Sequence, residues 1–206
     1  MDKKFVITVG RQFGSGGLDV AIHLSKLMNV NYYDTKLIFE AAKRSGLSNE
    51  YIEDVEEKTP SPLFYAFTLG FGFNSGFSSE NVVNIQSETI RDIAERESCI
   101  IVGRSADYVL RDNPHSINIF VHAPEEFRIK QISKRKDISC KEAADLIRKI
   151  DKSRAAYYDF YTNKKWGASA SYHLSIDSSI LGIEKTAEYI RDFIMLKLEN
   201  NDESMG

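Results

Sequence analysis

The feature that most constrains this chain is a glycine-rich turn near its N-terminus, between an apolar run and an amphipathic segment. The apolar run covers residues 5–9, and the turn reads Val9-Gly10-Arg11-Gln12-Phe13-Gly14-Ser15-Gly16-Gly17-Leu18. Glycines let a backbone approach an anion closely, and the dipole of a following helix adds partial positive charge at the same point. The pattern predicts a strand, a phosphate-binding loop and a helix N-terminus. The candidate nucleotide-phosphate contacts are Gly10, Arg11, Gly14, Ser15, Gly16, Gly17 and Leu18.

The turn departs from the common nucleotide-binding pattern G-x-x-x-x-G-K-[ST]. One extra residue separates Gly10 from Gly16, Gly17 stands where lysine is expected, and Leu18 replaces the hydroxyl that binds magnesium. Arg11 either supplies the positive charge that Gly17 lacks or faces solvent in a tight turn. Ser15 is either a metal ligand or a serine that hydrogen bonds to the backbone of its own turn.

Four further apolar runs, at residues 30–33, 99–102, 117–121 and 172–176, alternate with helical patterns. Strands that alternate with helices imply right-handed crossovers and a parallel sheet. We therefore expect one α/β domain built on a five-stranded parallel sheet.

Two long insertions interrupt this alternation. The core is expected at residues 1–34, 98–123 and 170–199, and the insertions at 35–97 and 124–169. Open α/β sheets bind ligands beyond the carboxyl ends of their strands, where both insertions emerge, so we expect them to cover a site. The first insertion contains an aromatic, glycine-rich stretch at residues 64–77, which could be a specificity pocket, a flap or a subunit contact.

The composition narrows the class of partner. A chain of 206 residues with 42% hydrophobic and 28% charged residues suits one soluble domain, and a net charge of -3 argues against wholesale nucleic-acid binding. Cys99 and Cys140 form no C-x-x-C pattern, which predicts neither a disulfide framework nor a zinc site. The first apolar run is too short for a signal peptide or a membrane span. We expect a cytoplasmic protein with a small-molecule partner and no nucleic-acid or membrane partner; the oligomeric state stays open.

Charged residues follow two of the predicted strands. Asp34 ends the second strand, where it could hold magnesium through water, meet a substrate hydroxyl, or cap the helix that begins at Thr35. Arg104 ends the third strand. Its guanidinium suits a phosphate monoester, and the alternative is an ion pair with Asp107 or Asp112.

A third group of charges recurs every three residues on a predicted helix. Arg148, Asp151 and Arg154 share roughly one helical face, so Asp151 could brace both arginines into an anion-binding clamp. The alternative is a solvated face of salt bridges. The aromatic residues that follow, at 157–161 and Trp166, either stack on a base or pack in the core.

In this order, the motifs resemble the cytidylate kinase-like family of nucleoside monophosphate kinases. The resemblance depends on Gly10-Arg11-Gln12-Phe13-Gly14-Ser15-Gly16-Gly17, Tyr32-Tyr33-Asp34, Ile101-Val102-Gly103-Arg104, Arg128, Asp151-Lys152-Ser153-Arg154 and Ile176-Asp177-Ser178-Ser179. It implies a P-loop NTPase-type three-layer α/β/α fold with a helical acceptor-binding insertion and a lid. It also implies ATP and Mg²⁺ as cofactors, and transfer of a phosphoryl group to a nucleoside monophosphate or a similar small acceptor.

The resemblance assigns roles to single residues. Residues 14–17 correspond to the donor-phosphate loop, and Arg104, Arg128 and Arg154 to the catalytic arginines. The substrate contacts would be Asp34, Arg104, Arg148, Asp151 and Arg154, and the metal ligands Ser15 and Asp34. Cytidylate kinases carry lysine and a hydroxyl residue where this chain has Gly17 and Leu18, so the alternative function is a non-catalytic nucleotide-binding or sensor module with a kinase fold.

Overall fold

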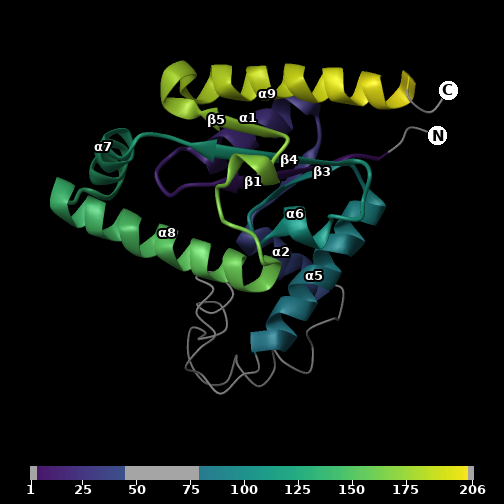
Figure 1. The fold of residues 1–206 in the computed structure, drawn as a ribbon, viewed down its shortest axis with the longest axis horizontal. Coiled ribbons are helices and arrows are strands. Elements are labelled where there is room, and N and C mark those ends of the chain that lie inside the picture. The colour runs from purple at the N-terminus through teal and green to yellow at the C-terminus, as the bar shows by residue number, and fades with distance from the viewer. Residues whose placement is uncertain (1–3, 45–78, 204–206) are drawn as a thin grey trace.

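The protein has a central parallel sheet between two layers of helices (Figure 1). The computed structural model describes residues 4–44 and 79–203. The strands are β1 (Val6–Arg11), β2 (Asn31–Tyr33), β3 (Cys99–Val102), β4 (Ser116–His122) and β5 (Leu174–Asp177). Their order is β2-β3-β1-β4-β5, and every neighbouring pair is parallel. The predicted three-layer α/β fold with a five-stranded parallel sheet is confirmed.

The two faces of the sheet are covered by different helices. One face packs against α1 (Gly17–Met28) and α9 (Ser178–Glu203), and the other against α2 (Thr35–Arg44), α5 (Ser79–Arg96) and α6 (Ala106–Val109). Because successive side chains of a strand point to opposite faces, Ile100 joins the first core and Ile101 the second. Strands buried on both faces read as continuous apolar runs, as the largely buried strands β1, β3 and β4 do, whereas the edge strands β2 and β5 are only partly buried.

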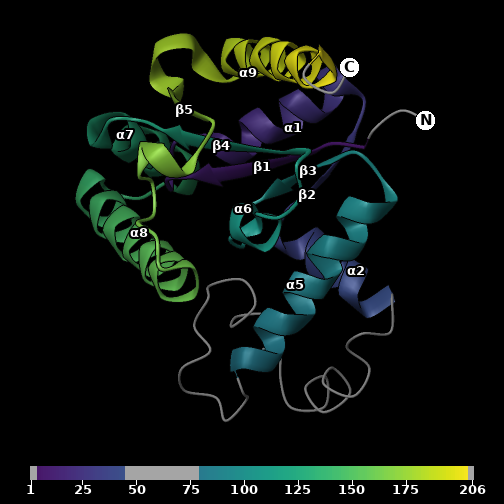
Figure 2. The ribbon, with the colours of Figure 1, turned by 45° about the vertical axis from the view of Figure 1, so that its right-hand side comes forward.

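A third, smaller core joins α7 (Glu125–Lys136) to α8 (Cys140–Thr162). Figure 2 shows this pair at one side of the sheet, apart from α2 and α5. Helix α8 begins with a capping box, in which the Glu142 N–H donates to Ser139 Oγ at 3.2 Å and the Ser139 N–H donates to Glu142 Oε2 at 2.9 Å. A single turn of 3₁₀ helix, η1 (Ser169–Ser171), leads from α8 to β5.

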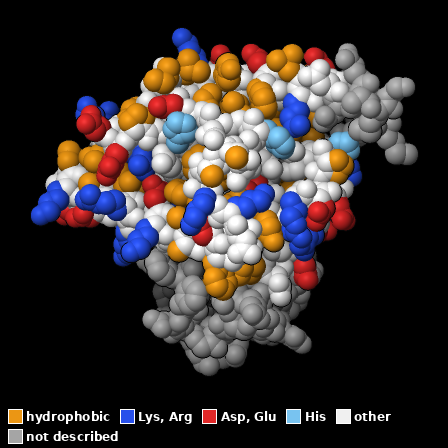
Figure 3. Space-filling model, in the orientation of Figure 1, with side chains coloured by type: hydrophobic (Ala, Val, Ile, Leu, Met, Phe, Trp, Pro, Cys, Tyr) orange, Lys and Arg blue, Asp and Glu red, His pale blue; other side chains and the backbone are white. Residues whose placement is uncertain are grey.

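The aromatic, glycine-rich stretch at residues 64–77 lies outside the described residues, so its role stays a prediction, as does the division into core, acceptor insertion and lid. No helix in the described part of the chain combines the length and the apolar character needed to cross a bilayer. On the face shown in Figure 3, positive and negative side chains are interspersed, without one continuous basic surface.

Candidate active site

A strained turn at the end of β3 positions Arg104. Gly103, Arg104 and Ser105 follow one another with φ values of 81°, 59° and 49°, all in the left-handed region. Two consecutive non-glycine residues in that region cost free energy, and such strain often marks a functional site. The Nε atom of Arg104 donates a hydrogen bond to Thr35 Oγ1 at 3.0 Å. The turn therefore holds a guanidinium group beyond the carboxyl end of the sheet.

Arg11 reaches the same place from the end of β1. Its stem passes over Gly17, where an added Cβ atom would lie 2.5 Å from Arg11 Cβ and 3.1 Å from Arg11 Cγ. Its guanidinium group lies against Gly103, where an added Cβ atom would collide with Arg11 Nη1. The side chain of Arg11 thus occupies space that two glycines leave open.

Arg154 comes from the middle of α8. Its Nη1 atom donates a hydrogen bond to the backbone carbonyl of Arg11 at 3.0 Å, and its Cζ atom lies 5.7 Å from the centre of the Phe13 ring. Helix α8 therefore touches the glycine-rich loop at its start, and the two arginines share one small region.

The arginines perturb one another. Burial and the charges of Arg154 and Arg104 lower the pKa of Arg11 well below its ordinary value. Burial lowers the pKa of Arg104 to about 10, with a further contribution from Arg154. Among the described residues no carboxylate forms an ion pair with Arg11 or Arg154, although Asp34 and Asp151 lie close enough to act electrostatically on Arg11, and Asp151 on Arg154. Positive charges gathered in this way favour an anionic ligand.

These side chains line one cavity, which we call the arginine cavity. Its described lining consists of Thr8, Val9, Gly10, Arg11, Thr35, Gly103, Arg104, Ser105, Asp107, Ser153, Arg154, Tyr157, Tyr158, Trp166 and Tyr172. The cavity lies beyond the carboxyl ends of β1 and β3, where α/β sheets bind their ligands. Within the part of the chain that the structure describes, the Ser105 Oγ atom is buried and has no hydrogen-bond partner, so it is available to a ligand.

Part of the cavity wall is aromatic, formed by Tyr157, Tyr158, Trp166 and Tyr172. The Phe120 ring lies behind this wall, edge-on to Trp166 at 5.5 Å and tilted against Tyr172 at 4.9 Å between ring centres. The Tyr158 hydroxyl donates to Asp107 Oδ2 at 2.7 Å, and burial raises the pKa of this carboxyl above its ordinary value. Asp107 is the one carboxylate in the described lining. The cavity therefore combines positive charge, an aromatic surface and a single acid.

The glycine-rich loop lies beside this cavity. Residues 14–17 are not part of its described lining, but helix α1 begins at Gly17, directly after Gly16 with φ 75°. Among the described residues, none accepts a hydrogen bond from the backbone N–H of Gly14, Gly16 or Gly17. Unpaired amides at a helix N-terminus favour a phosphate group.

Side chains limit the space over this loop. A Cβ atom at Gly14 would lie 3.1 Å from Arg128 Cβ and 3.0 Å from Ile132 Cγ1, and one at Gly16 would collide with Ile183. The loop is therefore enclosed by α7 on one side and by the start of α9 on the other.

The two candidate metal ligands have other partners. Ser15 is fully buried, and its hydroxyl lies 2.9 Å from the Gln12 carbonyl and 3.1 Å from the Val121 carbonyl. It is thus a serine bonded to backbone, and this geometry does not fit a metal ligand. Asp34 caps α2, since its Oδ1 atom accepts a hydrogen bond from the Leu37 N–H at 3.0 Å. Across residues 4–44 and 79–203, no three His, Cys, Asp or Glu side chains gather as a metal site.

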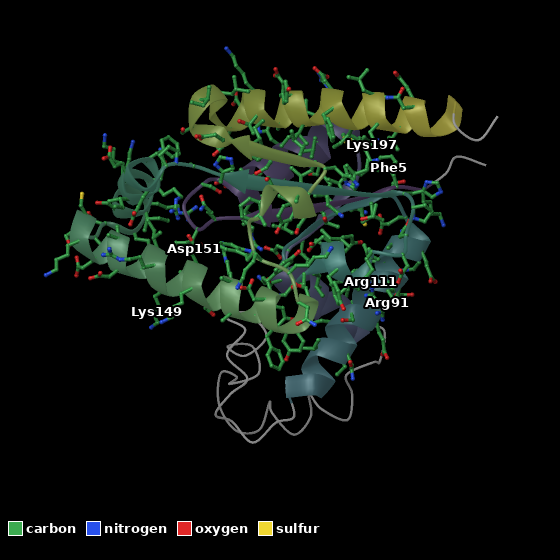
Figure 4. The ribbon with its side chains drawn as sticks, in the orientation of Figure 1. Phe5, Arg91, Arg111, Lys149, Asp151 and Lys197 are labelled. Carbon is green, nitrogen blue, oxygen red and sulfur yellow. The ribbon has the colours of Figure 1, made fainter. Side chains whose placement is uncertain are left out.

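Arg128 and Asp151 form a buried ion pair behind the loop, with 2.7 Å between Arg128 Nη1 and Asp151 Oδ2. Arg128 also donates to the carbonyls of Ala123 and Phe13, and the Phe13 N–H donates to Asp151 Oδ1 at 2.8 Å. Figure 4 shows Asp151 on the side of α8 that faces the sheet, opposite Lys149. This pair fixes the loop to α7 and α8, and Arg128 does not line the arginine cavity.

The predicted clamp of Arg148, Asp151 and Arg154 is corrected. Arg148 is exposed and pairs with Asp145 at 2.9 Å, one turn earlier on α8. Asp151 bonds Arg128 instead of bracing two arginines of its own helix, so Arg154 alone of the predicted arginine pair lines the cavity. Spacing along one helix could not reveal the partner from α7.

Sequence reasoning missed the roles of Ser178 and Asp107. The Ser178 hydroxyl is fully buried, 2.6 Å from the Ser15 carbonyl and 3.2 Å from the His122 carbonyl, so it ties the glycine-rich loop to the start of α9. Asp107 bonds Tyr158 rather than Arg104. Ser178 lies in a motif that carried the family resemblance, which was the only signal for it.

A five-stranded parallel sheet in this order, with a glycine-rich loop after β1 and arginines beyond the strand ends, defines a three-layer α/β fold of the P-loop kinase type. The chain belongs to the cytidylate kinase-like family, whose sequence profile matches residues 6–180. It is similar to the cytidylate kinase of Staphylothermus marinus, with 26% identity over 193 residues that cover 92% of this chain and 96% of the relative. The cytidylate kinase of Aeropyrum pernix is 24% identical over 178 residues, covering 86% and 91%.

Solved structures agree on the fold. An uncharacterized protein from Eubacterium ventriosum superposes with a TM-score of 0.72 at 28% identity, covering 93% of this chain and 98% of the other. A shikimate kinase from Bacteroides thetaiotaomicron superposes with a TM-score of 0.56 at 12% identity, with coverage of 93% and 98%. At that identity the likeness concerns the fold alone.

Proposed function

We propose that this protein transfers the γ-phosphoryl group of ATP to a nucleoside monophosphate or a similar small acceptor. The observation that carries the proposal is the convergence of Arg11, Arg104 and Arg154 in one cavity next to the glycine-rich loop. Phosphoryl transfer needs positioning and charge stabilisation more than a covalent nucleophile, and arginines supply both. The cytidylate kinases among the relatives support a nucleotide as the acceptor.

On this proposal the donor phosphates bind at the glycine-rich loop. The backbone N–H groups of Gly14, Gly16 and Gly17 and the N-terminus of α1 face the donor, with Gly10, Ser15 and Leu18 completing the loop. Arg128 supports the loop from behind through its bonds to Phe13 and Asp151, which makes it a positioning residue. Arg154, bonded to the first residue of the loop, lies between donor and acceptor.

The acceptor occupies the arginine cavity. Arg104 and the Ser105 hydroxyl bind the phosphate of the acceptor. The aromatic wall with Trp166 and Tyr172 packs against the remainder of the acceptor. During transfer, a phosphate oxygen of the acceptor forms a bond to the γ-phosphorus while the bond between that phosphorus and the β,γ-bridging oxygen breaks. ADP leaves, and Arg154 stabilises the charge on the migrating group.

Mg²⁺ fits this proposal as a companion of the nucleotide phosphates. It takes most of its ligands from phosphate oxygens and water in such sites, and one or two protein carboxylates suffice. Ser15 does not fit, whereas Asp34 uses one oxygen to cap α2 and lies near Arg11. When bound, the ion neutralises charge on the transferred group. The cytoplasmic location expected from the sequence is part of the same proposal.

A second function is a nucleotide-binding or sensor module without catalysis. It is favoured by Gly17 and Leu18 at the positions of the lysine and the hydroxyl residue, and by the inward bonds of the Ser15 hydroxyl. A sensor needs the phosphate-binding loop but no transfer chemistry.

The test is a coupled assay of ADP formation with ATP, Mg²⁺ and a panel of nucleoside monophosphates. We expect turnover with at least one acceptor, and a loss of about 10²–10³ in kcat for Arg154→Ala. The matched control is Arg148→Ala on the same helix, which should stay within about twofold of wild type because Arg148 is exposed and bonded to Asp145. ATP binding without turnover of any acceptor would favour the sensor.

A further inference from the structure

The glycine at position 17 is not required by the backbone. Gly14, Gly16 and Gly103 have φ values of 84°, 75° and 81°, which side chains rarely adopt, but Gly17 lies in the first turn of α1 and has no such φ. An L-residue could therefore adopt its conformation without backbone strain. Some other feature must account for glycine at Gly17.

That feature is the side chain of Arg11. A Cβ atom at Gly17 would lie 2.5 Å from Arg11 Cβ, closer than real Cβ contacts, and 3.3 Å from Val121 Cβ, which a small shift can relieve. Because Arg11 Cβ is attached directly to the backbone of β1, it cannot move aside as the end of a long side chain can. Arg11 and a side chain at position 17 thus exclude each other.

The guanidinium group of Arg11 lies where both proposed substrates meet. It packs against Gly103 at the end of β3, and it is close enough to Arg104 and Arg154 for their charges to lower its pKa. No carboxylate among the described residues forms an ion pair with Arg11. The charges of Arg104 and Arg154 act against the charge of Arg11, and an anion bound between the three guanidinium groups would offset this repulsion.

We propose that Arg11 replaces the lysine of the usual nucleotide loop, with its guanidinium binding the phosphoryl group that moves from donor to acceptor, and that Gly17 is glycine because Arg11 fills its side-chain space. This inference depends on the proposed function for the identity of the transferred group. Its geometric part, the mutual exclusion of Arg11 and a side chain at position 17, depends only on the structure. The positive charge of the loop therefore comes from β1 instead of from α1.

The mutual exclusion predicts a reciprocal pattern of variants. Arg11→Ala removes the charge, so kcat should fall by about 10²–10³. Gly17→Lys adds a charge at the usual position but clashes with Arg11, so the melting temperature and kcat should both fall. In the double variant Arg11→Gly/Gly17→Lys the Cβ atom at position 11 is gone as well, so the space is open, and kcat should exceed that of Arg11→Gly by about tenfold or more. Arg135→Ala is the control, since Arg135 is exposed and lies 3.9 Å from Asp19.

Binding of inorganic tripolyphosphate, followed by isothermal titration calorimetry, separates this inference from the proposed function. We expect wild type to bind the probe, Arg11→Ala to lose about tenfold or more in affinity, and the double variant to regain it. Equal affinity of wild type and Arg11→Ala would overturn the inference even where turnover is observed. A wild-type protein that binds tripolyphosphate through Arg11 but turns over no acceptor would overturn only the transfer step. A Gly17→Lys variant with wild-type melting temperature and activity would overturn the mutual exclusion.

Discussion

Arg154 Nη1 donates a hydrogen bond to the backbone carbonyl of Arg11 at 3.0 Å, which joins two residues 143 positions apart in the chain. This contact connects α8, in the second insertion, with the end of β1, where the glycine-rich loop begins. Both residues line the arginine cavity. The proposed donor and acceptor sites adjoin at this junction.

Removal of Arg128 should destabilise the protein strongly. Arg128→Ala leaves the Asp151 carboxylate partly buried with one fewer partner and leaves the Phe13 carbonyl without its donor. Breaking a buried ion pair costs about 3 kcal/mol or more in free energy of unfolding, whereas loss of an exposed pair costs below about 1 kcal/mol. Urea denaturation checks this, with Arg135→Ala on the same helix as the control. Equal losses for the two variants would contradict the structural role of Arg128.

Ser178 should stabilise the loop through its buried hydroxyl. Ser178→Ala removes the donor to the Ser15 carbonyl, so the free energy of unfolding should fall by about 1–3 kcal/mol. Ser179→Ala, which loses only a partly buried bond to the carboxylate of Asp177, should cost less. Hydrogen exchange should also show faster exchange of loop amides in Ser178→Ala. Unchanged stability of Ser178→Ala would show that the loop is not held by this contact.

Tyr158 should matter more at neutral than at acid pH. The Tyr158 hydroxyl donates to the Asp107 carboxylate, whose pKa burial already raises. Tyr158→Phe removes a donor that favours the charged form, so the pKa of Asp107 should rise further and stability at neutral pH should fall by about 1–3 kcal/mol. The loss should shrink as the pH falls and Asp107 is protonated. Thermal unfolding of both proteins between neutral and acid pH measures this difference, and a loss independent of pH would contradict it.

His173 should make stability fall toward acid pH. Its Nδ1 atom accepts a hydrogen bond from the Asn118 N–H at 2.9 Å, and burial together with the charge of Lys197 lowers the pKa of this imidazole below its ordinary value of 6.5. A depressed pKa means that the unfolded chain binds the proton more readily. The stability that His173 contributes is therefore present above about pH 6.5 and is lost as the pH falls below it.

The variant His173→Gln keeps an acceptor for the Asn118 N–H without titrating in this range. The difference in melting temperature between wild type and this variant should therefore change sign or shrink as the pH falls below about 6.5. A constant difference across that range would show that the imidazole is not held neutral.

The fold followed from the sequence because its three central strands, β1, β3 and β4, are largely buried on both faces. The apolar run at residues 99–102 identified a strand without any information about the neighbouring strands, and the observed strand has the same bounds. The fifth strand begins two residues later than expected, at Leu174, since Tyr172 instead packs its ring on Phe120.

The site followed less well because its contacts cross between elements. The spacing of Arg148, Asp151 and Arg154 favours pairing within one helix, but the closest partner of Asp151 is Arg128 on a neighbouring helix. Likewise, no pattern in the amino-acid sequence shows that the Arg11 side chain fills the space beside Gly17. The family resemblance indicated which residues belong together, and only the packing showed how they pair.

A crystal structure of the protein with a non-hydrolysable ATP analogue and a nucleoside monophosphate tests the two proposed sites most directly. We expect triphosphate oxygens within about 3 Å of the backbone amides of residues 14–17, and the acceptor phosphate at a similar distance from the guanidinium groups of Arg104 and Arg154. An acceptor bound elsewhere, or a triphosphate that does not touch the loop, would contradict it.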